Sequence, residues 1–402
     1  MRILFLSPAA GLGGAERALL EMLAALRERE PSWALRLVAF EDGPLMARAA
    51  ALGVESDVRA LPASLAATGE FGRPRAELLL RSAFAARPLV PFAFALRREV
   101  EEWRPDVIHS NGIKAHLLGP WIRAGVPLVW HVHDYLSDRK MSARLMRLQS
   151  RSAALVIANS TSVADDLAAV LGPGVRIETI YNAIDLRRFR PDGPALDLDA
   201  ACGLPPAPAG AVRVGLVGTF ARWKGHEVFL QALAGLNAPQ AIRAYVVGGP
   251  VYRTGLASQH TESGLRALAA GLGLESIVGF TGFLDDPADA YRALDVVVHA
   301  STRPEPFGLS IAEAMACGRA VIISDAGGAR EIGKSGRTHL THTPGDEASL
   351  RAALLQLASD AALRQRLGDA AAQCVSERFS RAALAAALSA AYRAVAGETR
   401  RA

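Results

Sequence analysis

Two glutamates stand eight residues apart in the stretch Ala300–Gly318, which reads ASTRPEPFGLSIAEAMACG. Glu305 lies between two prolines in a polar loop, and Glu313 lies in the helix-forming sequence that follows. The apolar run Val296–Val298 before the loop indicates a buried strand. The first amides of the predicted helix have no partner within it, so they could bind an anion. We expect the ligand to meet the chain here, although spacing alone leaves an acid/base pair and two solvated surface side chains both open.

Two further loops could approach a phosphate group. The segment Gly11–Gly14 lies between a predicted strand and a predicted helix, where a tight turn is the alternative. The segment Thr219–Gly225, TFARWKG, offers Arg222 and Lys224 to a diphosphate, with a solvated basic turn as the alternative. A dinucleotide fingerprint would require G-x-G-x-x-G, whereas the first loop reads G-L-G-G-A-E, which disfavours a dehydrogenase.

Two histidines and an aspartate end another predicted strand, in the order His131, His133 and Asp134. The alternation of side chains along a strand puts both imidazoles on one side, as in some metal sites. No third ligand follows at a suggestive spacing. A neutral histidine that hydrogen-bonds a hydroxyl group is therefore the favoured interpretation.

The composition is that of a globular protein, with 402 residues, 50% of them hydrophobic and 21% charged. This length suits two domains. The chain has three scattered cysteines, Cys202, Cys317 and Cys374. Their odd number and spacing fit a reducing compartment rather than a disulfide framework. The opening MRILFLSP predicts a buried strand rather than a signal peptide, and the longest later apolar run, Pro88–Leu96, is too short to span a membrane. We expect a cytoplasmic protein.

Strands that alternate with helices predict an α/β fold of two Rossmann-like, doubly wound parallel-sheet domains that face a cleft. The strands expected are 3–6, 35–40, 107–109, 126–131, 155–158 and 176–180, then 212–217, 242–247, 277–281, 295–299 and 320–324. A stretch rich in proline predicts a linker at 191–211. The domains are therefore expected at 1–190 and 212–377, with a C-terminal helix, about 378–402, joining the first.

Taken together, these fragments resemble the retaining family 4 glycosyltransferases, group 1, which have the GT-B fold. The segment Glu305–Glu313, EPFGLSIAE, resembles the E-x(7)-E motif of that family. Other matching fragments follow in the expected order: GGAER at 13–17, HD at 133–134, ANS at 158–160, YNAID at 181–185, VGTFARWKG at 217–225, FTGF at 280–283 and GGAREI at 327–332. Each fragment is unspecific, but their order and spacing are specific.

The resemblance implies a role for each matching residue. Glu313 would hold the donor ribose and Glu305 would face the transferred sugar, while Lys224 would neutralise the leaving diphosphate. Arg222 would substitute for an arginine that relatives carry where this chain has Thr219. The remaining roles concern the donor: the amides of Phe307, Gly308 and Leu309 would contact it, Gly13 and Gly14 would pack beside its diphosphate, His133 would contact its sugar, and Phe283 and Leu284 would meet its base.

The implied reaction is transfer of a hexosyl group from a nucleotide sugar with retention of anomeric configuration. A leaving diphosphate needs positive charge, which cationic side chains and helix N-termini supply in place of a metal. No D-x-D metal motif is apparent in the loops, because Asp285–Asp286 and Asp165–Asp166 are adjacent pairs and the D-x-D at 197–199 lies in the predicted linker. We therefore expect activity without a metal or other cofactor.

The acceptor is expected to be a cell-envelope or lipid-linked glycan. Between Arg73 and Arg98 six arginines stand against one acid, Glu77, and aromatic residues are interleaved with them. Five basic residues and no acid also lie between Arg139 and Arg151. Local patches on a chain of net charge +5 favour an anionic membrane surface, here the inner face of the cell membrane, over nucleic acid. A solvated basic helix is the alternative.

Two other classes stay open. A nucleotide-sugar epimerase or another Rossmann-domain enzyme would bind NAD(P) rather than a nucleotide sugar alone. A non-catalytic nucleotide-sugar-binding protein would keep the fold without turnover, although the presence of Glu305, Glu313, Lys224 and His133 argues against it. The sequence does not specify the sugar, the base or the acceptor.

Overall fold

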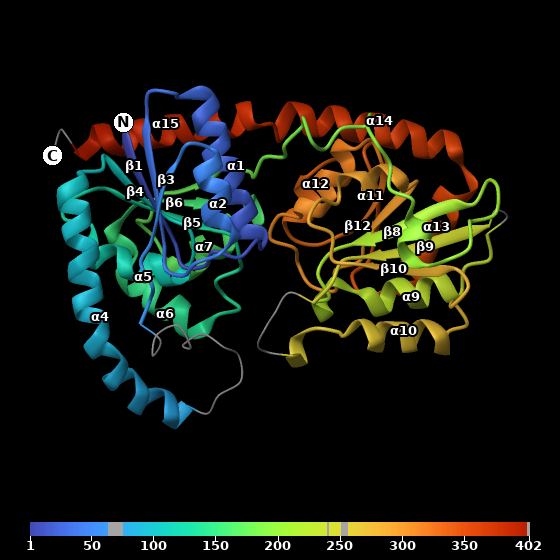
Figure 1. Ribbon diagram of the computed structural model, residues 1–402, viewed down its shortest axis with the longest axis horizontal. Helices are drawn as coiled ribbons and strands as arrows, with labels where there is room; N and C mark the ends of the chain where they lie inside the picture. Colours follow the sequence, from blue (N-terminus) through green and yellow to red (C-terminus); the bar gives the residue numbers. More distant parts are fainter. Residues whose placement is uncertain (63–74, 239–240, 251–255, 400–402) are drawn as a thin grey trace. The chain divides into compact units, whose positions relative to one another are not determined.

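The computed structural model describes residues 1–62, 75–238, 241–250 and 256–399, which form two compact units (Figure 1). Unit 1 consists of Met1–Ala183 together with Arg381–Ala402, and unit 2 of Ile184–Ser380. Each unit is built on one parallel sheet, as the alternation of strands and helices predicts.

The sheet of unit 1 has seven parallel strands in the order β3-β2-β1-β4-β5-β6-β7. Along β1, Ile3 and Phe5 enter one hydrophobic core, whereas Leu4 and Leu6 enter the core on the opposite face. Such strands are apolar on both sides because helices cover both faces of the sheet. The strands are β1 (Arg2–Ser7), β2 (Ala34–Ala39), β3 (Glu55–Val58), β4 (Val107–Ser110), β5 (Leu128–Val132), β6 (Ala153–Ala158) and β7 (Ile177–Thr179).

The helices of unit 1 cover the two faces. Residues of α1 (Gly14–Arg29), α2 (Pro44–Ala51) and α15 (Arg381–Thr399) share one core with the sheet. Among the described residues, helices that pack on the opposite face are α4 (Arg75–Trp103), α5 (Ile113–Ile122), α6 (Lys140–Gln149) and α7 (Thr161–Leu171). The sheet is therefore doubly wound.

Helix α15 brings residues from the far end of the chain into unit 1, beside α1 (Figure 1). The Arg381 guanidinium lies 2.7 Å from the Glu21 carboxylate on α1. The Tyr392 hydroxyl lies 2.8 Å from Nδ1 of His109 on β4, and both side chains are buried. Leucines of the same helix also belong to the core. The core of unit 1 is therefore completed by residues that follow unit 2 in the chain.

The sheet of unit 2 has six parallel strands in the order β10-β9-β8-β11-β12-β13. The strands are β8 (Val212–Val217), β9 (Ile242–Val247), β10 (Val278–Gly282), β11 (Val296–His299), β12 (Ala320–Ser324) and β13 (Leu340–His342). The helices are α8 (Leu198–Cys202), α9 (His226–Ala234), α10 (Glu262–Gly271), α11 (Ala288–Ala293), α12 (Leu309–Ala316), α13 (Glu347–Ser359) and α14 (Ala361–Arg378). Residues of α9, α10, α13 and α14 share one core with the sheet.

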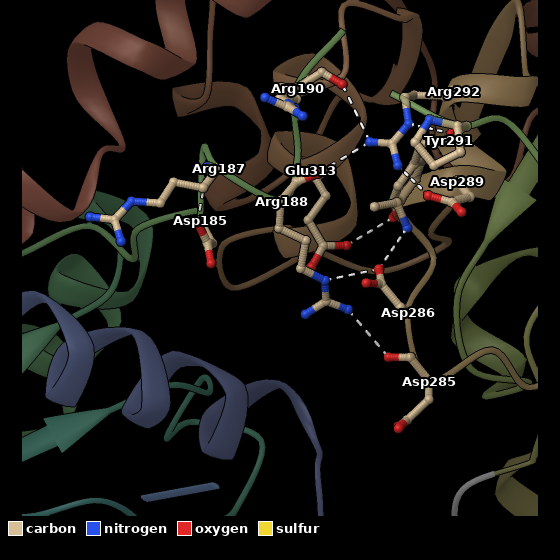
Figure 2. A network of polar contacts seen from close by, with 12 residues as sticks. Asp185, Arg187, Arg188, Arg190, Asp285, Asp286, Asp289, Tyr291, Arg292 and Glu313 are labelled. Carbon is tan, nitrogen blue, oxygen red and sulfur yellow. Dashed lines mark hydrogen bonds and ion pairs between the residues drawn. The ribbon is translucent and has the colours of Figure 1, made fainter. Parts of the chain in front are cut away.

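The segment between the two sheets differs from the linker expected at 191–211, because it belongs to unit 2 from Ile184 onward. Figure 2 shows the reason in Arg292 on α11. Its guanidinium donates to the carbonyl oxygens of Pro194 at 2.6 Å and Arg188 at 3.2 Å, and it pairs with Asp289. These bonds hold the start of the proline-rich segment on α11 of unit 2, and α8 forms further along the same segment.

In the part of the chain that the structure describes, no helix combines the length and the apolar character needed to cross a membrane. The three cysteines carry free thiols.

The ends of the parallel strands gather the polar loops of each unit. In unit 2, β8 leads to the turn with Lys224, β10 to Phe283 and β11 to Glu305. In unit 1, β1 leads to the glycine loop, β4 to Asn111 and β5 to His133. Ligands of doubly wound sheets bind at this carboxyl edge, so the predicted site residues lie where the fold favours a site.

Candidate functional site

Glu305 and Lys224 form a buried ion pair in unit 2. The Lys224 ammonium lies 2.7 Å from Oε2 of Glu305, and only 7% of Glu305 is exposed. The backbone also fixes the loop, because the amide of Gly328 donates to the Glu305 carbonyl oxygen at 2.7 Å. Two of the predicted catalytic residues, 81 positions apart, therefore meet.

The charge of Glu305 depends on its partners. Burial raises the pKa of this carboxyl, but the Lys224 ammonium and a hydrogen bond with His299 outweigh burial and lower the pKa to about 2. The carboxylate is therefore ionised at neutral pH. A buried carboxylate with a mobile cation beside it is suited to a site where charge develops on a ligand.

A glycine turn brings Lys224 to this place. Residues Arg222–Lys224 form a short 3-10 helix that ends at Gly225, whose φ of +75° is in the left-handed region. A Cβ at Gly225 would lie 1.9 Å from the carbonyl oxygen of Ala300, so only glycine lets the turn approach the end of β11. The amide of Thr302 also donates to the Trp223 carbonyl oxygen at 2.7 Å.

Arg222, the other predicted cation, points elsewhere. Its Nε donates to the carbonyl oxygen of Ala257 at 3.0 Å, and its guanidinium lies 3.6 Å from the Glu227 carboxylate. The side chain is more than half exposed. The structure therefore joins Lys224, but not Arg222, to Glu305, and the diphosphate role of Arg222 stays a prediction.

Helix α12 starts directly after Glu305. Gly308 precedes its first residue with a φ of +103°, and Leu309 opens the helix. The first amides of a helix have no acceptor within it, so those of Gly308 and Leu309 are positioned to meet an anion. The Phe307 side chain is buried, edge-on to Phe379 at 5.5 Å between ring centroids, so it anchors the loop.

Glu313 lies on α12 and is held by a phenol. The Tyr291 hydroxyl donates to Oε2 of Glu313 at 3.0 Å, and Tyr291 is fully buried on α11 (Figure 2). Tyr291 is a neutral donor to Glu313, whereas a cation, the Lys224 ammonium, lies beside Glu305. The two glutamates do not share an environment, so they are suited to different tasks.

Phe283 and Leu284 follow β10 in a turn that reaches the segment after the first sheet. Arg188 forms an ion pair with Asp286 at 2.8 Å and donates to the carbonyl oxygen of Asp285 at 3.3 Å (Figure 2). The Phe283 ring is 55% exposed, which is unusual for an aromatic residue at a strand end. An exposed ring at the carboxyl edge offers a base a surface for stacking.

In unit 1, His133 is tied to the end of β4. Its Nε2 lies 2.7 Å from Oδ1 of Asn111, whose amide nitrogen donates to the Ala15 carbonyl oxygen at 3.3 Å. Burial lowers the pKa of His133 to about 4, and Asp134 offsets this only in part. His133 is therefore neutral and donates from Nε2 to Asn111. A neutral ring is what the predicted hydrogen bond to a hydroxyl group presumes.

The glycine loop of unit 1 carries an acid of its own. Gly13 caps α1, and the Glu16 carboxyl folds back to hydrogen-bond the backbone at Gly13 and Glu16. Burial raises the pKa of Glu16, while these backbone bonds act in the opposite direction. The helix start expected to face a diphosphate through Gly13 and Gly14 is thus occupied by a carboxyl group.

The imidazoles of His131 and His133 stack at 4.3 Å between ring centroids, so they share one side of the strand as predicted. His131 is buried, and its nearest aromatic neighbours are His109 and His133. Among the described residues, no group of three or more His, Cys, Asp or Glu side chains is placed to hold a metal ion.

Three residues of the site were missed by sequence reasoning. His299 and Ser301 bond the Glu305 carboxylate, and Tyr291 bonds Glu313. His299 and Ser301 stand two apart where β11 runs into the loop, a pattern that could have indicated two polar groups on one side. Nothing in the spacing of Tyr291 points to α12.

Two doubly wound sheets with a carboxylate, a lysine and a helix start at the end of β11 define the GT-B class of glycosyltransferases. Two family models match the chain, and together they cover most of both units. "Glycosyl transferases group 1" matches residues 206–373, and "Glycosyltransferase Family 4" matches residues 12–188. The chain belongs to the group 1 glycosyltransferases of family 4.

Curated relatives carry names of the same kind. The chain is 35% identical over 277 residues to D-inositol 3-phosphate glycosyltransferase 2 of Catenulispora acidiphila, which is 62% of each chain. It is 33% identical over 221 residues to the lipopolysaccharide core biosynthesis mannosyltransferase LpcC of Rhizobium leguminosarum, 55% of this chain and 60% of that one. The matched region spans about three fifths of the length of these relatives.

A solved structure covers nearly the whole chain. The complex of Anabaena HepE with UDP superimposes with a TM-score of 0.81 at 28% sequence identity, over 98% of this chain and 100% of that one. The two-unit fold is thus that of known GT-B glycosyltransferases.

Proposed function

We propose that this protein transfers a hexosyl group from a nucleotide diphosphate sugar to an acceptor, with retention of anomeric configuration. The observation that carries the proposal is the buried pair of Lys224 and Glu305 at 2.7 Å, beside the first turn of α12. Transfer of a sugar requires stabilisation of a leaving diphosphate and of a positively charged sugar, and this arrangement offers a group for each.

The charges suggest how the residues divide the work. Lys224 exchanges the Glu305 carboxylate for the diphosphate, which also meets the amides of Phe307, Gly308 and Leu309. Glu305 is left as an anion facing the transferred sugar, and Glu313 accepts hydrogen bonds from the ribose. The other roles are those of the family: Arg222 and Gly13 with Gly14 serve the diphosphate, His133 the sugar, and Phe283 with Leu284 the base.

The proposal includes transfer without a metal ion. A lysine side chain and a helix start already supply positive charge where the diphosphate would leave. Turnover is expected to be the same in excess EDTA as in Mg²⁺ or Mn²⁺. A rate that depends on the added metal would contradict this part of the proposal.

The first donor to test is a UDP-sugar, because HepE of Anabaena has been solved with UDP and with UDP-glucose. A panel of UDP-, GDP- and ADP-sugars should give donor hydrolysis and a raised unfolding temperature with one base. Binding of NAD(P) together with a nucleotide sugar would favour the epimerase alternative, and binding of NAD(P) without any nucleotide sugar would favour another Rossmann-domain enzyme.

Replacement of Glu305 tests the chemistry. Glu305→Ala should abolish turnover of the accepted donor, because the group that faces the transferred sugar is removed. Glu347→Ala is the matched control, since Glu347 is a half-exposed glutamate on α13 in the same unit. Unchanged turnover in Glu305→Ala would refute the catalytic assignment. Binding of a nucleotide sugar without turnover by the native protein would favour the non-catalytic nucleotide-sugar-binding protein.

An NMR spectrum of the first product tests the stereochemistry. The product should show the donor's anomeric configuration, and inversion would contradict retention.

For the acceptor we propose a lipid-linked or cell-envelope glycan, handled at the cytoplasmic face of the membrane. The name of one relative supports this, since it concerns a lipopolysaccharide core, whereas the name of the other concerns D-inositol 3-phosphate, which is a small polar molecule. A lipid-linked acceptor would bring the protein to an anionic lipid surface.

The described residues add α6 as a second candidate for the membrane-facing segment, beside Arg73–Arg98, where Val90 and Phe94 are exposed. Of Arg73–Arg98, residues 73–74 and the side chains as far as 87 lie outside the described part. Arg97 and Arg98 are ion-paired with Glu101 and Glu102. On α6, in contrast, exposed Met141, Leu145 and Leu148 lie at helical spacing among basic residues and no acid. Such a face fits an anionic interface.

Liposomes test this surface. The protein should sediment with vesicles of anionic lipid, less so in high salt, and Leu148→Glu should weaken the effect because Leu148 is 77% exposed. Leu355→Glu on α13, a partly exposed leucine of unit 2, is the control and should sediment like the native protein. Equal recovery in the supernatant with and without vesicles would rule the membrane contact out.

A further inference from the structure

Three donors converge on one oxygen of Glu305. Besides the Lys224 ammonium at 2.7 Å, Nε2 of His299 lies 3.1 Å from Oε2 and the Ser301 hydroxyl donates to the same atom at 3.2 Å. The hydroxyl of Ser301 also lies 2.9 Å from Nε2 of His299. His299 and Ser301 are both buried. The carboxylate is thus held from one side by two uncharged groups and from another by a cation.

The neighbouring strand determines which nitrogen of His299 carries the proton. His299 pairs with Ile323 of β12, and the amide of the next residue, Ser324, donates to Nδ1 of His299 at 3.4 Å. An imidazole nitrogen that accepts a hydrogen bond bears no proton, so the proton of the neutral ring is on Nε2. The backbone of β12 therefore sets the tautomer that donates to Glu305.

The protonation state agrees with this geometry. Burial lowers the pKa of His299, and the hydrogen bond with Glu305 and its charge compensate only in part. The ring is therefore neutral at physiological pH. Ser301 is fixed as well, because the Ser324 hydroxyl donates to its carbonyl oxygen at 2.5 Å. Neither donor can follow a ligand out of the site, whereas the long Lys224 side chain, 19% exposed, can.

We propose that His299 is a positioning residue, which with Ser301 holds the Glu305 carboxylate in place when Lys224 leaves it for the donor's diphosphate. The inference rests on the proposed function, because it presumes that Lys224 has a diphosphate to move to. Without a fixed donor, a buried carboxylate that lost its cation would turn away or take up a proton.

Two substitutions of His299 separate the hydrogen bond from the volume of the ring. The His299→Gln side chain keeps an N–H that can reach Oε2, whereas His299→Leu fills the space without a donor. Loss of a hydrogen bond to a charged group predicts that kcat of His299→Leu falls by about 10- to 100-fold, with the KM for the donor nearly unchanged. His299→Gln should recover most of this loss. In His299→Leu the acid limb of the pH profile should also move to higher pH, because His299 helps to keep the carboxyl ionised.

A second buried histidine supplies the control. His339 is also buried, bonds Thr338 at 3.0 Å and has no described contact with Glu305. His339→Leu should change kcat and the acid limb little, even if it lowers stability. An equal loss of kcat in His339→Leu and His299→Leu, or no rescue by glutamine, would overturn the inference.

The tautomer can be measured without any turnover. In protein labelled with ¹⁵N-histidine, His299 should show a protonated Nε2 and an unprotonated Nδ1 at pH 7 to pH 8. A ring that titrates near pH 6.5, or one protonated at Nδ1, would refute the inference on its own. If the tautomer is as expected but no nucleotide sugar is turned over by the native protein, the proposed function fails instead. The two failures are therefore distinguishable.

Discussion

At the scale of single residues, the site uses two glutamates that are chemically alike but have different surroundings. Glu305 is buried against the Lys224 cation and two uncharged donors, and its pKa is lowered to about 2. Glu313 is held by the phenol of Tyr291. A cation favours the ionised form of a carboxylate more strongly than a neutral hydrogen-bond donor does, so the two glutamates differ electrostatically.

The bond between Tyr291 and Glu313 leads to the first prediction. Tyr291→Phe removes the donor while the ring remains, so the Glu313 carboxylate, which we propose binds the ribose, should lose its orientation. We expect the dissociation constant of the nucleoside diphosphate to rise by about 3- to 10-fold. The difference in affinity between the nucleoside diphosphate and its 2′-deoxy analogue should become smaller as well. Titration calorimetry with both ligands measures the two effects.

A second buried tyrosine separates binding from packing. The Tyr245 hydroxyl donates to Asp199 at 2.9 Å, away from β11 and α12, so Tyr245→Phe should leave nucleotide affinity unchanged. If Tyr291→Phe weakened the ribo and deoxy ligands equally, Tyr291 would be acting through the fold and not through the ribose.

Sequence reasoning identified the charged residues of the site better than their partners. Glu305, Glu313 and Lys224 stand in motifs with recognisable spacing. His299 and Tyr291 act through contacts made by strand register and helix packing, which no spacing encodes. The direction of the Arg222 side chain also could not be predicted from its own motif, because its guanidinium lies beside the Glu227 carboxylate.

At the scale of elements, the turn at Gly225 joins β8 to the end of β11. Gly225→Ala would place a methyl group 1.9 Å from the Ala300 carbonyl oxygen at a φ of +75°. The turn would have to move, and Lys224 with it. We therefore expect turnover to fall by at least 10-fold, as for loss of a charged contact, together with a lower unfolding temperature.

Gly345→Ala isolates the cost of the backbone conformation. Gly345 also has a φ of +75°, but a Cβ there would meet nothing within 4 Å. This variant should lose about 1–2 kcal/mol of stability through strain alone and keep its activity. Similar activity in the two variants would contradict the role of Gly225 in placing Lys224.

Most elements of the sheets could be predicted, because buried parallel strands are continuous apolar runs. The two strands that were missed, β3 and β13, are short strands at sheet edges, with sequences ESDV and LTH. Their pairing depends on a neighbouring strand rather than on their own residues. The linker expected at 191–211 was likewise inferred from proline content, whereas the side chain of Arg292 decides where that segment packs.

At the scale of the whole molecule, each unit encloses neutral histidines. Burial lowers the pKa of His109 and of His226 to about 3, from an ordinary value near 6.5. In the unfolded chain these groups take up protons below pH 6.5, but in the folded protein they do not. Stability should therefore fall as the pH drops below 6.5, by about 2 kcal/mol per enclosed histidine at pH 5.

The lowered pKa of Glu305 does not obscure this effect. Its contribution to stability is present above its ordinary value of 4.5 and is lost only below it. A change in the urea midpoint of unfolding between pH 7, 6 and 5 would therefore come from the buried histidines and not from Glu305. A midpoint that is constant over this range would show that the imidazoles are protonated in the folded protein.

The placement of α15 has a consequence for biosynthesis. A ribosome releases residues in order, so Met1–Ala183 emerges long before the segment that completes its core. Helices α1 and α2 are made early, but the part of this face that receives Leu384, Leu388 and Tyr392 is uncovered while 184–380 is being made. Unit 2 is continuous in the chain and can fold as soon as it emerges. The nascent first sheet, in contrast, must wait with an exposed apolar surface, and is where chaperones would be expected to bind.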